Sequence, residues 1–499
     1  MGMFDRFKKQ PEQKRMFSAG KVDRLTASWT ATPQTPDMVV EGNLVALVAR
    51  SREQYANNDY ARRFVELVQS NVVGPQGVVM QSRAKNPRGA LDNLGNEAIE
   101  KAWEKWGRRG NCDVTGTLSW KQAQVMFIRT VVVDGECFIR KVKTKDGLKL
   151  QFIDPMLIDV GYKHDGLKGG RYIRAGIEFD EWGQPVAYHV KTNTGEDTYS
   201  LGGKSYTRVD AKHIIHGFLP ERIAQKRGLP WMSTALSRMK QLDAYEEAAV
   251  VAARVGASKL GFFKSSDGEA FQGTDYNSDG EIITDAEPGT FHQLPAGVDF
   301  TAFDPGYPTG EFDGFVKSCL RGISSGLGVS YNTLANDLEG VNFSSIRAGV
   351  LEDRESWKML QEFLVDTFCR PLYEEWLALS LVTGAVVVQG GSLGIGRLDK
   401  FKDAHWQPRR WSWVDPVKDI QAAKEAIRLG LRSRSDVIRE MGRDPSDVWT
   451  EIKAERELMQ SLDVPIDNST QMSTAETVST SVAVEAEEGE TPDAPQTED

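Results

Sequence analysis

The chain has 499 residues, of which 40% are hydrophobic and 26% charged, a composition typical of folded proteins. No apolar stretch approaches the roughly 20 residues of a membrane helix, and the four scattered cysteines lack the spacing of a zinc site or a disulfide framework. The formal net charge is −10, but residues 464–499 hold nine acids and no Lys or Arg, which leaves −1 for residues 1–463. Tight nucleic-acid binding needs many basic side chains to neutralise phosphates. Residues 1–463, with a net charge of −1, are therefore not expected to bind DNA tightly.

The N-terminal third predicts an arm followed by helices. Residues 1–36 are first Lys/Arg-rich and then Ser/Thr/Pro-rich, which is typical of a mobile arm. Apolar residues at helical intervals then predict two helices within 43–73, separated near Asn57-Asn58, and further helices over 95–106 and 118–133.

Residues 136–191 consist of short alternating segments separated by turn sequences such as Asp146-Gly147 and Trp182-Gly183. The connections are too short for crossover helices, so the strands are expected to be antiparallel. With the helices that flank it, this region predicts an α+β fold.

Long helices dominate the rest of the chain. Regular apolar spacing predicts a helix over 231–259, with small side chains in its second half, and a second over 309–327. A third is expected over Ser345–Phe368, kinked or ended by Pro371. Between the first two, the turn-rich stretch has two β-like pieces, Glu281–Thr284 and Thr290–Leu294. Helices also fit 416–462, whereas 464–499 is disordered by composition.

Motifs for enzyme chemistry are weak. Gly203-Lys204-Ser205 lacks the preceding glycine and the following helix of a phosphate-binding loop. His213 and His216 are three residues apart in a β-rich stretch, which favours satisfied histidines over metal ligands. No metal, cofactor or catalytic residue is assigned, although a triad assembled from distant residues stays open.

Six stretches carry a resemblance. They are YARRFVELVQSNVVGPQGVVMQS (60–82), VVVDGECFIR (131–140), IEFDEWGQPVAYHV (177–190), HIIHGFLPERIAQKRGLPWMSTAL (213–236), FDGFVKSCLRGISSGLGVSYNTLANDLEGVNFSSIRAGVLEDRESWKMLQ (312–361) and VDPVKDIQAAKEAIRLGL (414–431). Occurring in this order, they resemble portal proteins of tailed bacteriophages, specifically the lambda type. The resemblance covers about residues 25–460.

The resemblance implies a portal-type subunit with an α+β wing, a helical stem, a clip and a crown. The expected parts are an arm (1–36), a wing (37–229), stem helix 1 (230–259), a clip (260–308), stem helix 2 (309–327), a tunnel loop (328–344), a long wing helix (345–371), the C-terminal part of the wing (372–413), crown helices (414–463) and a disordered acidic tail (464–499).

The resemblance also implies a function. Subunits of this family form a ring, typically of twelve, at one capsid vertex, through which DNA is packaged and ejected. The implied partners are other copies of the chain, double-stranded DNA passing without sequence recognition, the terminase packaging motor, the major capsid protein and a head–tail connector protein, with no membrane. The implied place is the virion, after assembly in the host cytoplasm. A hydrolase and another head–tail adaptor are the alternatives.

Two sets of residues are candidates for this function. Those expected to line the DNA tunnel are Lys317, Arg321, Tyr331, Asn332, Asn336 and Asn342. The alternatives are a solvated helix face with an Asp313–Lys317 pair, and an ordinary surface loop over 328–343. Those expected to pack between subunits are the small residues Ala248, Ala249, Ala252 and Ala253.

Overall fold

The computed structural model describes most of the chain between residues 32 and 462. The described residues are 24, 32–89, 91–192, 205–257, 261–265, 298–302, 310, 312–339, 343–411, 416–441, 443 and 445–462. The chain divides into two compact units, Met1–Arg409 and Arg410–Asp499. Within the described segments, no helix combines the length and the apolar character that crossing a membrane requires.

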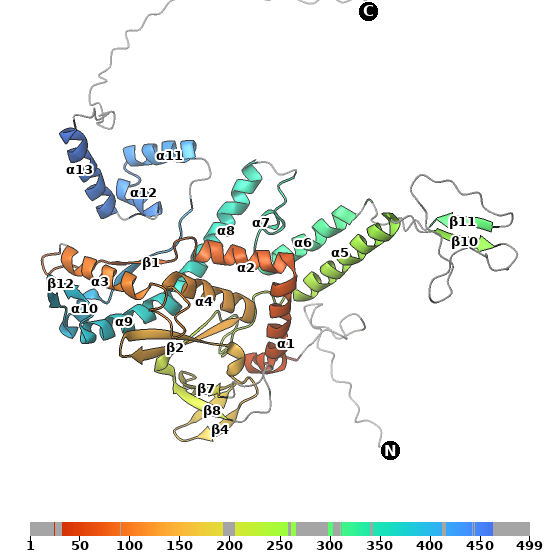
Figure 1. The fold of residues 1–499 in the computed structure, drawn as a ribbon, viewed down its shortest axis with the longest axis horizontal. Helices are drawn as coiled ribbons and strands as arrows, with labels where there is room; N and C mark the ends of the chain where they lie inside the picture. Colours follow the sequence, from red (N-terminus) through yellow and green to blue (C-terminus); the bar gives the residue numbers. More distant parts are fainter. Residues whose placement is uncertain are drawn as a thin grey trace, which may run out of the picture. The chain divides into compact units, whose positions relative to one another are not determined.

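The first two described helices of the larger unit are α1 and α2 (Figure 1). α1 (Pro36–Asn57) starts after Thr35, whose hydroxyl accepts a backbone hydrogen bond from its first turn. Asn58 is extended and caps α2 (Asp59–Val72) in the same way. The predicted break at this asparagine is confirmed, and α1 begins earlier than predicted.

Two further helices enclose a tryptophan cluster. α3 (Asn93–Trp106) and α4 (Trp120–Asp134) match the predicted helices, and α4 begins with a capping box formed by Ser119 and Gln122. β1 (Val79–Ser82) pairs with β14 (Ala404–Gln407) beside them. The clustered aromatic side chains, from segments far apart in sequence, are Trp103, Trp106, Trp120, Tyr373, Trp376 and Trp406.

Two antiparallel sheets follow, as predicted. The first has the order β3-β2-β9 and contains β2 (Glu136–Thr144), β3 (Gly147–Ile153) and β9 (Ile214–Phe218). The second runs in chain order through β4 (His164–Leu167), β5 (Arg171–Arg174), β6 (Ile177–Phe179), β7 (Pro185–Lys191) and β8 (Tyr206–Asp210). Short 3-10 helices lie at Pro155–Leu157 and Ala211–His213.

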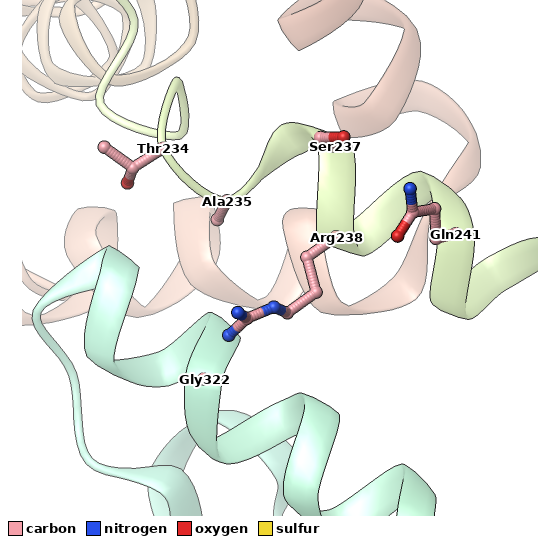
Figure 2. Close-up of a pocket in the computed structure, with 6 residues that line it drawn as sticks. All are labelled: Thr234, Ala235, Ser237, Arg238, Gln241 and Gly322. Carbon is pink, nitrogen blue, oxygen red and sulfur yellow. The ribbon is translucent and has the colours of Figure 1, made fainter. Parts of the chain in front are cut away.

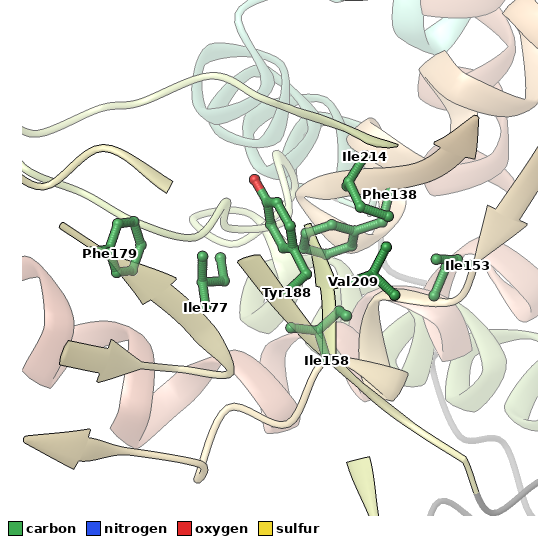
Figure 3. Close-up of a cluster of buried hydrophobic side chains, with 8 residues drawn as sticks. All are labelled: Phe138, Ile153, Ile158, Ile177, Phe179, Tyr188, Val209 and Ile214. Carbon is green, nitrogen blue, oxygen red and sulfur yellow. The ribbon is translucent and has the colours of Figure 1, made fainter. Parts of the chain in front are cut away.

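The two sheets share a hydrophobic core (Figure 3). Phe138 of β2 and Tyr188 of β7 meet edge to face, with ring centroids 5.7 Å apart. The buried residues of the cluster are Phe138, Ile153, Ile158, Ile177, Phe179, Tyr188, Val209 and Ile214. The core therefore joins strands from both sheets.

The long helices differ from the prediction at their ends. α5 (Leu236–Ala257) starts five residues late, because Ser233 and Ala235 donate backbone bonds three residues back, to Pro230 and Met232, and so form turns. α6 (Phe312–Leu327) matches closely. Between them, β10 (Gly261–Ser265) pairs with β11 (Val298–Ala302), whereas both predicted β-like pieces lie outside the described residues.

Pro371 does not end the third long helix. α8 (Phe343–Leu364) continues through a π-helical turn, Val365–Cys369, into α9 (Arg370–Thr383). The proline lies in the first turn of α9, where a missing N–H costs little because the wider π turn has already broken the regular hydrogen bonding. Smaller elements complete the unit: β12 (Val387–Val388), β13 (Gly391–Ser392), a 3-10 helix at Ile395–Arg397 and α10 (Leu398–Phe401).

The smaller unit contains the three helices predicted for residues 416–462. They are α11 (Pro416–Arg428), α12 (Arg434–Glu440) and α13 (Pro445–Ser461). Gly430 follows α11 with φ +73°, a left-handed conformation that glycine adopts readily at the end of a helix.

Candidate channel and subunit-packing residues

The two predicted stem helices, α5 and α6, are held together by aromatic and glycine contacts. Tyr245 of α5 stacks on Phe312 of α6 with ring centroids 5.6 Å apart, and it meets Phe315 at 4.9 Å. At the other end, the Thr234 hydroxyl donates a 3.0 Å hydrogen bond to the carbonyl oxygen of Gly326. Contacts near both ends of α6, at Phe312 and at Gly326, therefore hold it against α5 and the residues just before α5.

A polar cavity lies between the same two helices (Figure 2). Its volume is about 370 Å³, and it is lined by Thr234, Ala235, Ser237, Arg238, Gln241 and Gly322. The Arg238 side chain reaches across to α6 and lies over Gly322, where a Cβ atom would stand 1.6 Å from Nη1. The absence of a side chain at position 322 is what allows this contact. Sequence reasoning missed Arg238, although two glycines four residues apart, Gly322 and Gly326, are a signal for close helix approach.

Lys317 lies among carboxylates. Its Nζ is 2.9 Å from Asp313, 3.6 Å from Glu339 and 3.9 Å from Asp337. The hydrogen bond with Asp313 and the surrounding acids raise the pKa of the ammonium group. The pair anticipated as the alternative thus exists, and two further carboxylates join it, so that the charge of Lys317 is compensated within the chain.

Arg321, Tyr331 and Asp337 form a small cluster beside it. The Arg321 guanidinium lies 5.4 Å from the centre of the Tyr331 ring, within range of a cation–π contact. The Tyr331 hydroxyl donates a 2.7 Å hydrogen bond to Asp337. Arg321 itself is exposed, which leaves its charge available to solvent or to a ligand.

The tunnel loop expected over 328–344 is not a loop throughout. Within it, α7 (Tyr331–Ala335) is a short helix whose Leu334 is 2% exposed, and Val329 is also buried. Ser330 binds Asp353 of α8 through both its backbone N–H, at 3.2 Å, and its hydroxyl, at 2.7 Å. Burial of these apolar side chains fixes the first half of the segment against its neighbours.

The candidate asparagines that the structure describes differ in exposure. Asn332 is half-buried on α7, and Asn336 is exposed just after it, with φ +54°. This left-handed conformation is one that asparagine tolerates better than most residues. Asn342 lies outside the described residues.

The four alanines of α5 have different surroundings. Ala249 is 4% exposed and so is already covered by its own chain, which removes it from the set available to a neighbour. Ala252 is half-buried, whereas Ala248 and Ala253 are exposed. Between them lie Val250 and Val251, which are 60% and 48% exposed. The exposed apolar surface of α5 is therefore broader than the alanines alone suggested.

A buried ionic network that sequence reasoning did not anticipate lies where the chain approaches α5. Arg227 is 0% exposed, and its Nη2 is 2.6 Å from Oε1 of Glu136, which is also enclosed. His216 donates from Nε2 to the same carboxylate at 3.0 Å. Arg227 also donates to the carbonyl oxygens of Pro155, Ile158 and Ala175.

This network is satisfied internally. Burial alone would raise the pKa of Glu136, but Arg227 and His216 hold it below its usual value. Burial lowers the pKa of His216, which keeps the imidazole neutral. His216 is thus a satisfied histidine, as expected, and the network joins β2 and β9 to the segment that leads into α5.

Comparisons with known proteins give consistent matches. A family model described as "Phage portal protein, lambda family" matches residues 22–361. The probable portal protein of Halomonas phage phiHAP-1 is 34% identical over 468 residues, covering 92% of this chain and 89% of its own. Portal protein B of Escherichia phage lambda is 21% identical over 482 residues, covering 85% and 86%. A chain in the neck of an empty GTA particle superposes with a TM-score of 0.41 and 14% identity, covering 81% of this chain and 94% of its own.

Proposed function

The chain belongs to the lambda family of phage portal proteins, and on that premise we propose that twelve copies form a ring at one vertex of the capsid, with double-stranded DNA passing through its bore. Portal proteins are structural components of the capsid, so the expectation of a non-enzymatic protein is confirmed by family membership. Neither the hydrolase nor the adaptor alternative is retained.

The observation that carries the proposed ring is the exposed surface of the α5–α6 pair. The two helices contact each other through Tyr245, Phe312 and Phe315, and yet Phe315 remains 51% exposed. Val250 and Val251 of α5 are exposed as well. Large apolar side chains that stay exposed on long helices favour packing against another chain. We assign α5 and α6 to the stem, and residues 260–308 to the clip between them.

The charge of the candidate channel residues is compatible with DNA that moves. Lys317 is compensated by carboxylates, whereas Arg321 keeps an exposed guanidinium. A bore lined by few free cations binds phosphates weakly, so DNA is neither held nor excluded. In this proposal Arg321, Tyr331 and Asn336 face the bore, from the tunnel segment 328–344 and the end of the second stem helix.

The remaining assignments follow the same scheme. The wing comprises 37–229 and 345–413, and the crown 414–463. We propose that the ring contacts the terminase packaging motor, the major capsid protein and a head–tail connector, and that it assembles in the host cytoplasm before it becomes part of the virion.

The test is the mass of the purified assembly. Native mass spectrometry of the full chain should give a mass twelve times that of one subunit, and negative-stain images should show rings with a central hole. A monomer that persists at high protein concentration would contradict the proposal. Rings with another subunit number would correct the stoichiometry alone.

A further inference from the structure

The cavity between α5 and α6 carries one positive charge and no negative one (Figure 2). Its lining residues are Thr234, Ala235, Ser237, Arg238, Gln241 and Gly322. Arg238 is the one ionisable side chain among them. The volume of about 370 Å³ lies in the range of small-ligand sites, which is roughly 300–1,000 Å³. A cavity of this size with a polar, positively charged lining suits a small anion.

Arg238 has no countercharge in the described part of its own chain. Its guanidinium forms neither an ion pair nor a hydrogen bond with any residue that the structure describes. Neighbouring cations differ. Nζ of Lys240, two residues along α5, lies 3.2 Å from a carboxylate oxygen of Glu53. Nζ of Lys317 on α6 lies 2.9 Å from a carboxylate oxygen of Asp313. The five N–H donors of Arg238 are therefore available to a ligand.

A glycine of the facing helix sets the position of Arg238. The side chain reaches across to α6, where a Cβ atom at Gly322 would stand 1.6 Å from Nη1. An arginine on an open helix face samples many rotamers, whereas the close approach to α6 restricts this one. A side chain that is restricted before binding loses less conformational entropy when it holds a ligand.

Two neutral side chains add hydrogen-bonding capacity to the lining. Ser237 and Gln241 are exposed, lie one turn apart on α5 and, like Arg238, have no hydrogen-bond partner within the described segments. Together the three side chains offer a hydroxyl, an amide and a guanidinium, and the described lining holds no carboxylate that competes for them. A guanidinium binds phosphate through two parallel hydrogen bonds, and the remaining phosphate oxygens accept from other donors. The lining therefore favours phosphate over a carboxylate, which has only two oxygens.

We propose that this cavity binds a single phosphate group, with the Arg238 guanidinium as its charged ligand and Ser237 and Gln241 as further donors. Both walls belong to the larger unit of one chain, so the site does not rest on the proposed ring. The phosphate group belongs either to a free ion or to the backbone of DNA, and the test separates these two sources.

The test is equilibrium dialysis of the full-length protein against radiolabelled inorganic phosphate, in a chloride buffer of constant ionic strength. The wild type should bind one phosphate per chain. Arg238→Gln should weaken binding by at least about tenfold, because it removes charge-assisted hydrogen bonds. Lys240→Gln is the matched control, since it removes one positive charge from the same helix but lies outside the cavity lining. It should bind phosphate as the wild type does.

Gly322→Ala tests the site without removing its charge. The added methyl group displaces the guanidinium from its position over α6, so phosphate affinity should fall several-fold although Arg238 is still present. Circular dichroism of this variant should show an unchanged helix content. Equal phosphate affinity in the wild type, Arg238→Gln and Gly322→Ala would overturn the inference.

Competing ligands and the mass of the sample separate the outcomes. Displacement of the label by short duplex DNA assigns the site to backbone phosphates, whereas retention assigns it to a free phosphate, and either result supports the inference. Failure of the wild type to bind phosphate, or equally effective displacement by acetate, overturns it. Native mass spectrometry of the same samples tests the ring separately. A ring mass without bound phosphate overturns this inference alone, and bound phosphate with a monomer mass contradicts the ring alone.

Discussion

Arg227 and Glu136 form an ion pair that is enclosed on all sides although the two residues are 91 positions apart in sequence. The pair joins the start of β2 to the segment before α5 and is completed by His216. Both charges are desolvated, so each of them would destabilise the folded protein if the other were absent.

Removing one partner should therefore be strongly destabilising. Arg227→Met leaves the Glu136 carboxylate buried without its countercharge, and we expect a loss of about 3–5 kcal/mol in the free energy of unfolding. Urea unfolding followed by tryptophan fluorescence measures it. Lys101→Met, which breaks the exposed pair with Glu97, is the control and should cost less than about 0.5 kcal/mol. Equal effects of the two substitutions would show that the buried pair has no special role.

The same network predicts a loss of stability in mild acid. The pKa of His216 is lowered below 6.5 by burial, so the unfolded chain takes up a proton that the folded chain does not. The contribution of His216 to the free energy of unfolding should be fully present above about pH 6.5. It should be lost progressively as the pH drops below that value. The pKa of Glu136 is also lowered, and its contribution is lost at lower pH still, below 4.5.

Melting temperatures between pH 8 and pH 4 test this dependence. His216→Gln keeps a hydrogen-bond donor toward Glu136 but cannot titrate, so it should flatten the fall between pH 6.5 and 5. His189 is the control site, because burial lowers its pKa as well. His189→Gln reports how much of the fall in melting temperature arises from a histidine outside the network. A curve for His216→Gln parallel to that of the wild type would refute the assignment.

Two glycines differ sharply in what a methyl group would meet. At Gly228 a Cβ atom would stand 2.0 Å from the carbonyl oxygen of Gly135, which is backbone and cannot move aside. Gly228→Ala should therefore lower the free energy of unfolding by about 3 kcal/mol. At Gly322 the obstacle is the flexible end of the exposed Arg238, so Gly322→Ala should be neutral or stabilise by up to about 1 kcal/mol. Thermal unfolding of both variants checks the contrast, which a similar loss in both would contradict.

The sequence predicts well those features that depend on neighbours along the chain. The period of Phe315, Leu320 and Ile323 places α6 within three residues of its true start. The start of α5 is less accurate, because the hydrogen bonds that make turns of Trp231–Ala235 leave no periodic signal. The sequence predicts that Pro371 kinks or ends the third long helix. The helix does not end there, because a π turn precedes the proline, and this turn also leaves no periodic signal in the sequence.

The site is harder to predict because its partners are distant in sequence. Lys317 has the periodicity of an exposed helix face, but the carboxylates of Asp337 and Glu339 come from 20 or more residues away. Glu136 meets His216 only through the register of β2 and β9. Burial of Ala249 likewise depends on which face of α5 its own chain covers.

Ring assembly should be sensitive to the exposed surface of α5. Ala252→Arg introduces a long charged side chain at a half-buried position and should prevent ring formation while each chain stays folded. Native mass spectrometry reports the assembly, and circular dichroism the helix content. Ala49→Arg, at an exposed position of α1, is the control and should still form rings. Wild-type-like rings from Ala252→Arg would place the subunit contact elsewhere.

The tunnel assignment is tested at Asn336, the exposed residue after α7. Its φ of +54° means that any substitution by a residue other than glycine adds backbone strain, so bulk must be separated from strain. Asn336→Gly relieves strain without adding volume, and Asn336→Ala adds strain alone. If the segment faces the bore, Asn336→Trp should permit ring assembly and still reduce packaged DNA, because the indole narrows the passage, whereas the other two variants should package normally. Phage complementation, scored separately for rings and for packaged DNA, gives both readouts. Normal packaging with tryptophan would move the segment away from the bore, and failed assembly would make it a subunit contact.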